Sequence, residues 1–344
     1  MTQLLLPSFF LSLFGIFSLF GIDWQFFFRQ TIYVIFGFLI FFVVKKIGSN
    51  FFYHNSQFFY WFFVFILILT YFLGLEVKGS RRWLDFYFFR FQPSEFFKVF
   101  FCLFLSVELS RRYLRFKGIV GFLKIFLLFI IPGLIIFKQP DLANTVIVFF
   151  IYLVMVFFSE FPKKYIVYLM SLIVLVMPLT WFLLADYQKS RIISFLNPHI
   201  DAKGTAYNMI QSVITIGSGK FWGRGLGLGT QSRLYFLPEN HTDFAFATLV
   251  EQFGFFGGAL VVIFYGVIIY LIASRAVKFY FQKEEESKKK FLFTLGILSY
   301  FVSHVVVNMG MNLGLLPIAG VALPFISYGG SSLVAILIGF ALIP

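Results

Sequence analysis

Five short polar clusters interrupt this otherwise apolar sequence, and each could do chemistry. The densest is Glu239-Asn-His-Thr-Asp243, which places three ionisable side chains within five residues, just before a long apolar run. A carboxylate there could act as a general base or bind a divalent cation. The alternative is structural, because Thr242 or Asp243 could cap the following helix, where an acid is also favoured. Both roles need an exposed carboxylate, so they are compatible.

Two further clusters carry positive charge. Arg81 and Arg82 precede Trp83 in a polar stretch that could bind a phosphate and stack on a sugar. The alternative is a solvated loop with Trp83 in the interfacial aromatic belt. Glu95 and Lys98 lie three residues apart and share one face of a predicted helix. Ionisable residues in apolar spans usually face a cavity or a partner, although a self-neutralising pair near the interface is the alternative.

The last two clusters connect apolar runs. Lys138-Gln-Pro-Asp141 predicts a short hairpin at the membrane edge, and it could equally be a plain polar turn. Residues 314–332 contain two prolines and several small residues, which favour a broken or re-entrant helix. Such backbone is tolerated at membrane depth only where it is buried or lines a cavity. Ser327 and Ser331 would supply hydroxyl groups there, although close packing through small residues is the alternative.

The composition indicates that these clusters belong to a membrane protein and not to a soluble domain. The chain has 344 residues, of which 60% are hydrophobic and 12% charged, with a mean hydropathy of +0.90. A soluble domain of this length could not bury so much apolar surface. The net charge of +13 would suggest nucleic acid in a soluble protein. Here the basic residues cluster in short loops, as the positive-inside rule expects, so we predict no nucleic-acid partner.

Ten apolar stretches are long enough to cross a bilayer, and we predict one polytopic, all-α membrane domain over residues 1–344. We expect the first stretch to be a retained helix and not a signal peptide, because no basic residue precedes it. The single cysteine, Cys102, lies inside a span, and no Cys/His metal cluster occurs. The predicted spans are 4–21, 26–44, 58–75, 93–109, 119–137, 142–158, 165–184, 243–273, 291–312 and 325–343.

Basic loops predict the orientation. Lys45–Lys46, the run 111–117, Lys163–Lys164 and the segment 275–290 fall on one side, which we assign to the cytoplasm. The long loops 76–92 and 185–242 then face the periplasm, the second between spans seven and eight. Within it, residues 205–216 have the spacing of an amphipathic helix.

A glycine-rich run follows this helix. Residues 217–229 fit neither nucleotide-binding template, because no GxxxxGK[ST] and no GxGxxG occurs. We therefore expect a flexible loop and no nucleotide site.

The five clusters, taken together, resemble the SEDS family (shape, elongation, division, sporulation) of polytopic peptidoglycan glycosyltransferases. The resemblance covers nearly the whole chain. It rests on RRWL at 81–84, QPSEFFK at 92–98, KQPDL at 138–142, the block from 210 to 244 ending in LPENHTDF, and LPFISYGGSS at 323–332. KQPD, GTQS at 229–232 and GLLPIAG at 314–320 are more similar to the RodA (cell-elongation) branch than to the FtsW (division) branch. Two positions depart from the family: Asn144 replaces a Gly-Thr-like step, and Gln252 replaces a second acid after Glu251.

The resemblance implies polymerisation of lipid II, with undecaprenyl pyrophosphate as the leaving group and inversion at the anomeric carbon. It implies that Asp243 is the general base and a tentative metal ligand. It also implies that Arg81, Arg82 and Lys98 stabilise the leaving pyrophosphate while Glu95 positions Lys98. Other residues expected to bind substrate in the same cavity are Trp83, Asp141, Glu239, His241, Ser327 and Ser331.

The resemblance also implies partners and a location. We expect a divalent cation (Mg²⁺ or Mn²⁺), a class B penicillin-binding protein, and membrane proteins of the elongation machinery. The active site is expected on the periplasmic side of the bacterial inner membrane. The alternatives are an FtsW-like division polymerase, a flippase or transporter of lipid-linked precursors, and a scaffold for wall synthesis. A scaffold would leave Glu95, Lys98 and Asp243 unexplained, and a transporter would need polar residues that continue across the bilayer.

Overall fold

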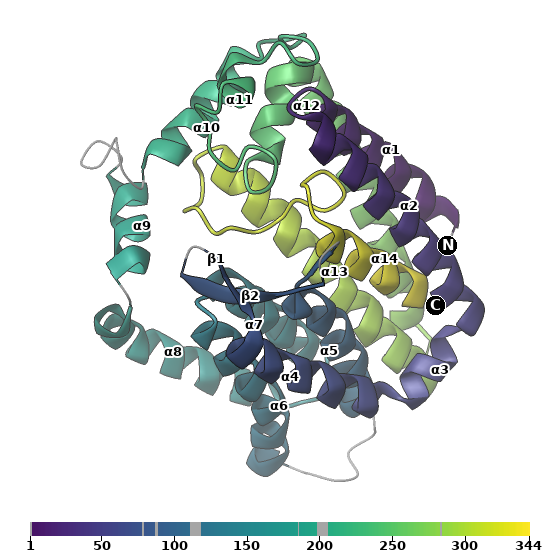
Figure 1. Ribbon diagram of the computed structural model, residues 1–344. Coiled ribbons are helices and arrows are strands. Elements are labelled where there is room, and N and C mark those ends of the chain that lie inside the picture. The colour runs from purple at the N-terminus through teal and green to yellow at the C-terminus, as the bar shows by residue number, and fades with distance from the viewer. Residues whose placement is uncertain are drawn as a thin grey trace.

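The computed structural model describes residues 2–77, 79–86, 89–110, 118–184, 186–197, 206–282 and 284–344, which form fourteen helices and three short strands. The helices are α1 (Thr2–Phe20), α2 (Trp24–Ile47), α3 (Ser49–His54), α4 (Ser56–Leu73), α5 (Pro93–Ser110), α6 (Gly118–Lys138), α7 (Leu142–Phe157), α8 (Lys163–Leu183), α9 (Asp186–Leu196), α10 (Tyr207–Ser218), α11 (Thr230–Arg233), α12 (Ala245–Tyr280), α13 (Glu285–Asn312) and α14 (Gly330–Leu342) (Figure 1). The strands are β1 (Leu75–Val77), β2 (Ser80–Asp85) and β3 (Arg90–Phe91).

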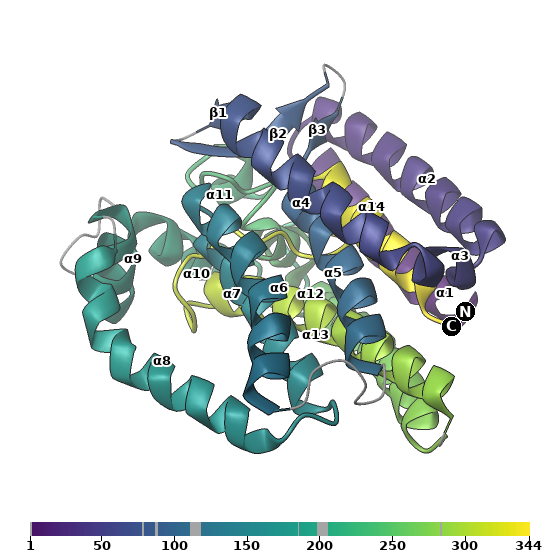
Figure 2. The same cartoon turned by 90° about the horizontal axis from the view of Figure 1, so that it is seen from below.

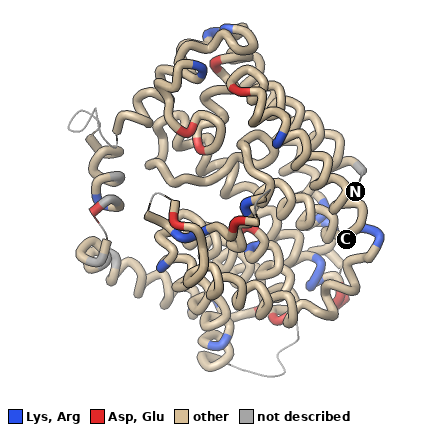
Figure 3. The backbone as a smooth tube through the Cα atoms, in the orientation of Figure 1, with Lys and Arg blue, Asp and Glu red and all other residues tan. Residues whose placement is uncertain are grey.

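Each predicted span coincides with one helix: α1, α2, α4 to α8, and α12 to α14. Within the described ranges, six helices are long and apolar enough to cross a bilayer, namely α1, α2, α4, α6, α12 and α13. The shorter α7 and α14 are also apolar, whereas α5 carries Glu95, Lys98 and Glu108. Charged positions are sparse along the helices (Figure 3). The chain is therefore a multi-pass helical membrane protein. The basic run 111–117, part of the orientation argument, lies outside the described residues.

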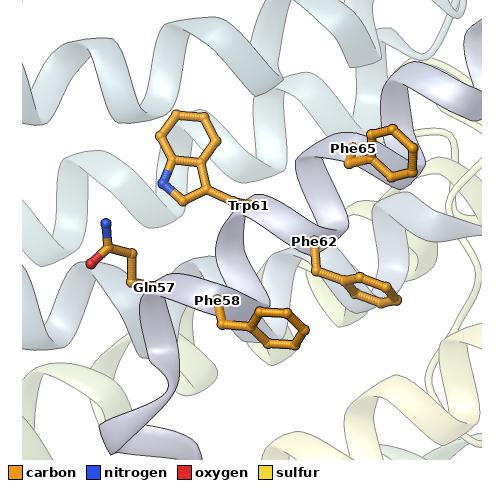
Figure 4. A pocket seen from close by; sticks show the side chains of 5 residues that line it. All are labelled: Gln57, Phe58, Trp61, Phe62 and Phe65. Atoms are coloured by element: carbon orange, nitrogen blue, oxygen red, sulfur yellow. The ribbon is translucent and has the colours of Figure 1, made fainter.

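The outer face of α4 shows why the chain is so apolar. Phe58, Trp61, Phe62 and Phe65 are all exposed and follow one face of this helix (Figure 4). The opposite face, which includes Tyr60 and other buried residues, packs against α5. A large aromatic surface of this kind is stable in lipid but would be costly in water. The exposed face of α4 therefore accounts for part of the phenylalanine excess.

Helix α13 forms the centre of the bundle. It packs against α12 on one side and against α5 and α7 on the other, and most of its residues are buried. Helices α1 and α2 cover α12 and α14, and α4 and α6 cover α5 and α7. Helices α8 and α9 form an arc at the edge of the molecule (Figures 1 and 2). Polar residues on α13 can therefore reach both halves of the bundle.

The segment between α4 and α5 contains a small antiparallel sheet in the order β1-β2-β3, which the sequence did not predict. Glu76 pairs with Arg81 across β1 and β2, and Leu84 pairs with Phe91 across β2 and β3. Successive side chains in a strand point to opposite faces. Arg81 and Arg82 are therefore directed to opposite sides of β2.

The predicted amphipathic helix is confirmed as α10, with bounds two residues later than expected. Met209, Ser212 and Thr215 form its buried face, and α10 packs against α12 and α13. Val213 and Ile214 are exposed on the other side. The apolar positions of the pattern therefore face outward, and the buried face is partly polar.

The expectation of a flexible glycine-rich loop was wrong. Helix α12 breaks at Gly254, where φ is 71° and ψ is −171°. The N–H groups of Arg224 and Gly225 donate to the carbonyls of Glu251 and Gln252, at 2.8 and 3.0 Å. Beyond the break, the Phe255 N–H donates to the Lys220 carbonyl at 2.8 Å. These backbone hydrogen bonds hold the loop 217–229 against the broken helix.

This close backbone approach predicts that replacing Gly254 by alanine destabilises the protein. A Cβ atom on Gly254 would lie 2.3 Å from Gly223 N and from Phe221 O, and its φ is positive. We expect Gly254→Ala to lower the free energy of unfolding by more than about 1 kcal/mol, although Ala normally stabilises a helix. The control is Gly266→Ala in the same helix, where a Cβ meets nothing within 4 Å. It should be neutral or stabilising in thermal unfolding of the detergent-purified protein, and equal behaviour of the two variants would contradict the close approach.

Candidate active site

A row of polar residues on α13 organises the site. Tyr300, His304, Asn308 and Asn312 are spaced by four, so they lie on one helix face. All four are at most 1% exposed. Sequence reasoning missed this row, although its spacing in an apolar span was a visible signal. The hydrogen bonds of these four side chains connect the polar clusters that the sequence singled out.

The predicted Glu95–Lys98 pair forms, and it is fully buried. Pro93 begins α5, and one turn later Lys98 Nζ lies 2.7 Å from Glu95 Oε1. The Tyr300 hydroxyl donates to Glu95 Oε2 at 2.9 Å. Lys98 Nζ also donates to Asn144 Oδ1 at 2.7 Å. The pair is therefore a satisfied interior network and not an ion pair at the interface.

His304 supplies the third partner of Lys98. Its Nε2 lies 2.7 Å from Lys98 Nζ, and its Nδ1 lies 3.1 Å from the Ala322 carbonyl. An ammonium group can only donate, so Nε2 accepts and Nδ1 carries the proton that is donated to Ala322. All three N–H donors of Lys98 are then used within the protein. Lys98 in this arrangement supports the 313–329 segment through His304.

The network continues to Asp141, at the start of α7, and from there to Arg82 on β2. Asp141 caps α7, accepting from the Asn144 backbone N–H at 3.3 Å and from Asn144 Nδ2 at 2.9 Å. Arg82 Nη1 lies 3.6 Å from Asp141 Oδ1, and Arg82 also donates to the carbonyls of Gln139 and Pro140. The structure therefore brings Arg82, Asp141 and Lys98 together through Asn144. Arg81 lies apart from them and pairs with Glu76 at 3.0 Å. Trp83 is half-buried in β2, where it pairs with Leu75 of β1.

The predicted irregular backbone is confirmed over residues 313–329. The His304 ring, the Asn308 amide and the Tyr265 hydroxyl donate to the carbonyls of Ala322, Val321 and Pro324 respectively. Buried carbonyls without such partners would be costly in an apolar interior. Side chains of α12 and α13 therefore make the irregular segment possible at this depth.

Ser327 lies in this irregular segment, and Ser331 follows it in α14. The Ser327 hydroxyl donates to the Thr242 carbonyl at 2.6 Å and accepts from the Leu323 N–H at 2.8 Å. The Ser331 hydroxyl donates to the Arg90 carbonyl at 2.9 Å and accepts from the Gln92 N–H at 3.0 Å. The Ser327 hydroxyl thereby joins the segment to the Asp243 loop, and the Ser331 hydroxyl joins α14 to β3 and the start of α5.

Asp243 is held by its backbone. Its carbonyl accepts from Asn308 Nδ2 at 2.9 Å and from Asn312 Nδ2 at 3.0 Å. The capping hypothesis for its side chain was wrong, because α12 begins at Ala245 with Phe244 at the N-cap position. Asn312 Oδ1 accepts from the Ala247 N–H at 3.0 Å and thereby replaces the side-chain N-cap of α12. The reason is tertiary, since α13 supplies the acceptor that Thr242 or Asp243 would otherwise provide.

The neighbouring predicted residues surround the same loop. Glu239 Oε2 accepts from the Thr242 hydroxyl at 2.9 Å. The His241 ring stacks on Phe26 with a centroid distance of 4.3 Å, and the His241 carbonyl accepts from the Tyr328 N–H. Residues 239–243 are therefore fixed between α2, α13 and the 313–329 segment.

The Asp243 carboxylate faces the irregular segment. A Cβ atom on Gly320 would lie 3.6 Å from Asp243 Oδ2, and Asp243 is half-buried. Across the described ranges, no three His, Cys, Asp or Glu side chains come together to hold a metal ion. A lone carboxylate fits a cation that retains waters and also binds substrate phosphates, as Mg²⁺ usually does. It does not fit a site built from protein ligands alone.

Glu251 is a further buried carboxylate, and sequence reasoning missed its role. Its oxygens accept from the backbone N–H groups of Gln231 and Ser232 at 2.9 and 3.0 Å, at the start of α11. Asn240 Nδ2 then donates to the Ser232 carbonyl at 2.6 Å. Gln252, a departure from the family pattern, donates to the Ser18 carbonyl of α1. Glu251 therefore fixes the approach to the Asp243 loop, and Gln252 ties that region to α1.

The chain matches known proteins over almost its full length. The model of the FtsW/RodA/SpoVE family, described as cell cycle proteins, matches residues 5–344. The chain is similar to the peptidoglycan glycosyltransferase MrdB of Escherichia coli K12, with 34% identity over 89% of this chain and 81% of the relative. It is similar also to the probable peptidoglycan glycosyltransferase FtsW of Haemophilus influenzae, at 34% identity over 89% of this chain and 77% of the relative.

Solved structures share the fold. One chain from a study of polymerisation and crosslinking by a peptidoglycan synthase complex superposes with a TM-score of 0.84 and 26% identity, covering 100% of this chain and 96% of that one. The rod shape determining protein RodA of Thermus thermophilus superposes with a TM-score of 0.72 and 24% identity, covering 99% and 94%. The second likeness concerns the fold alone.

The buried cluster allows structure and activity to be separated. Lys98→Ala leaves the Glu95 carboxylate buried without its cation, and we expect a loss of about 3–5 kcal/mol in the free energy of unfolding. The double variant Glu95→Gln, Lys98→Met carries no unpaired charge and should recover part of that loss, although Asn144 and His304 still lose the donor that Lys98 supplied. The control is Lys290→Ala, which removes the more exposed Glu286–Lys290 pair and should cost at most about 0.5 kcal/mol.

Thermal unfolding and glycan polymerisation are measured on all three variants. A double variant that is stable but inactive would assign the pair a functional role. A double variant that is stable and fully active would make the pair purely structural, and a harmless Lys98→Ala would contradict the burial itself.

Proposed function

The chain belongs to the FtsW/RodA/SpoVE family, and on that premise we propose that it is a peptidoglycan glycosyltransferase that polymerises lipid II during cell elongation. The observation that carries the proposal is the geometry of Asp243. Two asparagines hold its backbone carbonyl, and its half-buried carboxylate faces the irregular segment. The rival flippase would need a polar path through the bilayer. The described polar network instead joins the outer hairpin to the Asp243 loop.

The proposed reaction is a single displacement. The 4-hydroxyl oxygen of the lipid II acceptor attacks the anomeric carbon of the growing strand, which is linked to undecaprenyl pyrophosphate. The new glycosidic C–O bond forms as the bond to pyrophosphate breaks, and the pyrophosphate leaves with the electron pair. An α-linked donor gives a β-linked product, so one inversion suffices and one general base is needed.

Asp243 is proposed as that base. Its carboxylate would accept the proton of the attacking hydroxyl as the new bond forms. An ordinary carboxylate is a weak base for a sugar hydroxyl, so its surroundings must favour the transfer. The fixed backbone of Asp243 supports this role, because a base held in one position need not be reoriented during the reaction.

The other predicted residues are proposed in supporting roles. Arg82, beside Asp141, is the cation placed to stabilise negative charge on the leaving pyrophosphate. Glu95 and Lys98 position the 313–329 segment through His304, in place of the direct pyrophosphate contact expected from sequence. Trp83, Glu239, His241, Ser327 and Ser331 are proposed to line the substrate cavity.

A divalent cation, Mg²⁺ or Mn²⁺, would be held by Asp243 and substrate phosphates. When bound, it would screen the negative charge of the pyrophosphate. The residues of the chain then bind and orient the two substrates.

An elongation role and a partner follow from the same premise. The RodA-like motifs favour elongation over division. A class B penicillin-binding protein is the proposed partner, because the first structural relative comes from a complex that couples polymerisation to crosslinking. The proposed location is the bacterial inner membrane, with the Asp243 loop on the periplasmic side.

Orientation can be tested with introduced cysteines. The native Cys102 is fully buried and should not react. Thr230 on α11 and Glu285 on α13 are both exposed. In intact spheroplasts, Thr230→Cys should react with an impermeant maleimide and Glu285→Cys should react only after lysis. The reverse pattern would place the Asp243 loop on the cytoplasmic side and contradict the proposed reaction site.

Asp243→Asn tests the base. It keeps the size of the side chain and the backbone carbonyl that Asn308 and Asn312 hold, so thermal stability should be preserved. Polymerisation of labelled lipid II in detergent should fall at least about a hundredfold, the usual scale for losing a general base. Asp186→Asn, the same change at an exposed position in α9, should stay within a few-fold of the parent. Turnover by Asp243→Asn near the parent level would remove Asp243 from the mechanism and favour the transporter reading.

A further inference from the structure

The two adjacent arginines of β2 have different partners and different exposure to solvent. Arg82 turns toward the 139–141 turn and is occupied by Asp141 and two carbonyls. Arg81 forms a different ion pair, and its side chain is 52% exposed. Its ion-pair partner is Glu76 on β1, itself 58% exposed. Ion pairs between exposed groups are weak and are exchanged easily for another partner. Arg81 can therefore exchange its partner for an anionic ligand more readily than Arg82, whose side chain is 19% exposed.

Arg81 lines a cleft on the outer side of the hairpin. The cleft measures about 420 Å³ and lies where the end of α4, the β1–β2 hairpin and the turn after α6 meet. Lys138, the last residue of α6, lines it too. Lys138 is exposed, and no hydrogen bond or ion pair joins its side chain to another described residue. Two cations from separate elements therefore share the cleft with one carboxylate, Glu76.

One wall of the cleft is apolar. Tyr71 and Phe72 form it, near the end of α4, and Phe72 is 68% exposed. Both α4 and α6 are long and apolar enough to cross a bilayer, and both end at this cleft. The cleft therefore lies where two spans leave the hydrocarbon region. Aromatic and basic side chains at this level typically contact lipid headgroups.

We propose that this cleft binds the phosphate group of a membrane-anchored lipid. Arg81 and Lys138 are the phosphate ligands, and Tyr71 and Phe72 contact the first carbons of the lipid chain. Glu76 competes with the phosphate for Arg81. Among the described residues that line the cleft, the two cations and one carboxylate leave a net charge of +1. The site is separate from the residues around Asp243, and it depends on the membrane location alone and not on the transfer reaction.

Binding is measured by native mass spectrometry on the full chain in detergent, without turnover. The probes are undecaprenyl pyrophosphate, phosphatidylglycerol and inorganic pyrophosphate. At least one lipid should bind at least about tenfold more tightly than inorganic pyrophosphate, because only a lipid contacts the apolar wall. Preference between the two lipids identifies which one supplies the phosphate. Equal binding of inorganic pyrophosphate would overturn the assignment to a lipid.

Three substitutions in the cleft are expected to change its affinity for lipid, two by lowering it and one by raising it. Arg81→Gln and Lys138→Gln should each weaken lipid binding about fivefold, the scale of one basic residue at a membrane surface. Glu76→Gln should tighten it by a similar factor, a gain that misfolding cannot produce. Arg233→Gln removes an exposed arginine elsewhere on the outer side and should bind as the parent does.

Asp243→Asn should bind phosphatidylglycerol as the parent does. This probe is neither substrate nor product of the proposed reaction, so its binding separates the cleft from that reaction. Unchanged affinity in Arg81→Gln and Lys138→Gln, or no gain in Glu76→Gln, would overturn the proposal.

Discussion

The structure depends on one constraint: backbone groups that leave helical geometry inside an apolar protein must find hydrogen-bond partners. Two such segments meet in this chain, residues 239–244 and residues 313–329. The polar row on α13 supplies their partners. Asn308 donates to Asp243 and Val321, Asn312 donates to Asp243, and His304 donates to Ala322. Removing this row would leave several buried carbonyls unpaired, each at a cost of about 1–3 kcal/mol.

This constraint connects two clusters that look independent in the sequence. The Glu95–Lys98 pair lies on α5, and Asp243 lies 145 positions after Lys98 in the chain. Lys98 contacts His304, and Asn308 one turn later contacts the Asp243 carbonyl. Both clusters therefore bear on the same face of α13. A buried ion pair is weak evidence of stability, but here it orients a helix that holds the proposed base.

The outer hairpin divides its charges between two tasks. Strand alternation sends Arg82 to the buried Asp141 and Arg81 to the exposed cleft beside Lys138. The inner arginine extends the polar network that supports the site. The outer arginine remains exchangeable because its partner is exposed. Two neighbouring residues of one type thus acquire different chemistry from the direction in which the strand presents them.

Features that depend on neighbours in the chain could be predicted from the sequence alone. Apolar stretches predicted the positions of ten helices, six of which are long and apolar enough to cross a bilayer within the described ranges. The three-residue spacing of Glu95 and Lys98 predicted their contact, and two prolines predicted irregular backbone at 313–329. Local patterns of this kind follow from helix period, length and proline geometry, which do not depend on distant residues.

Only the tertiary structure decided which groups meet across the chain. His304 reaches Lys98 over 206 positions, and Asn308 reaches the Asp243 carbonyl over 65. Other contacts between separate segments explain why the predicted cap of α12 and the predicted flexible loop were wrong. Asn312 replaced the expected side-chain cap of α12, and carbonyls at 251 and 252 held a loop expected to be flexible. A hydrogen bond between distant segments leaves no periodic mark in the sequence, because its geometry exists only after the helices have packed.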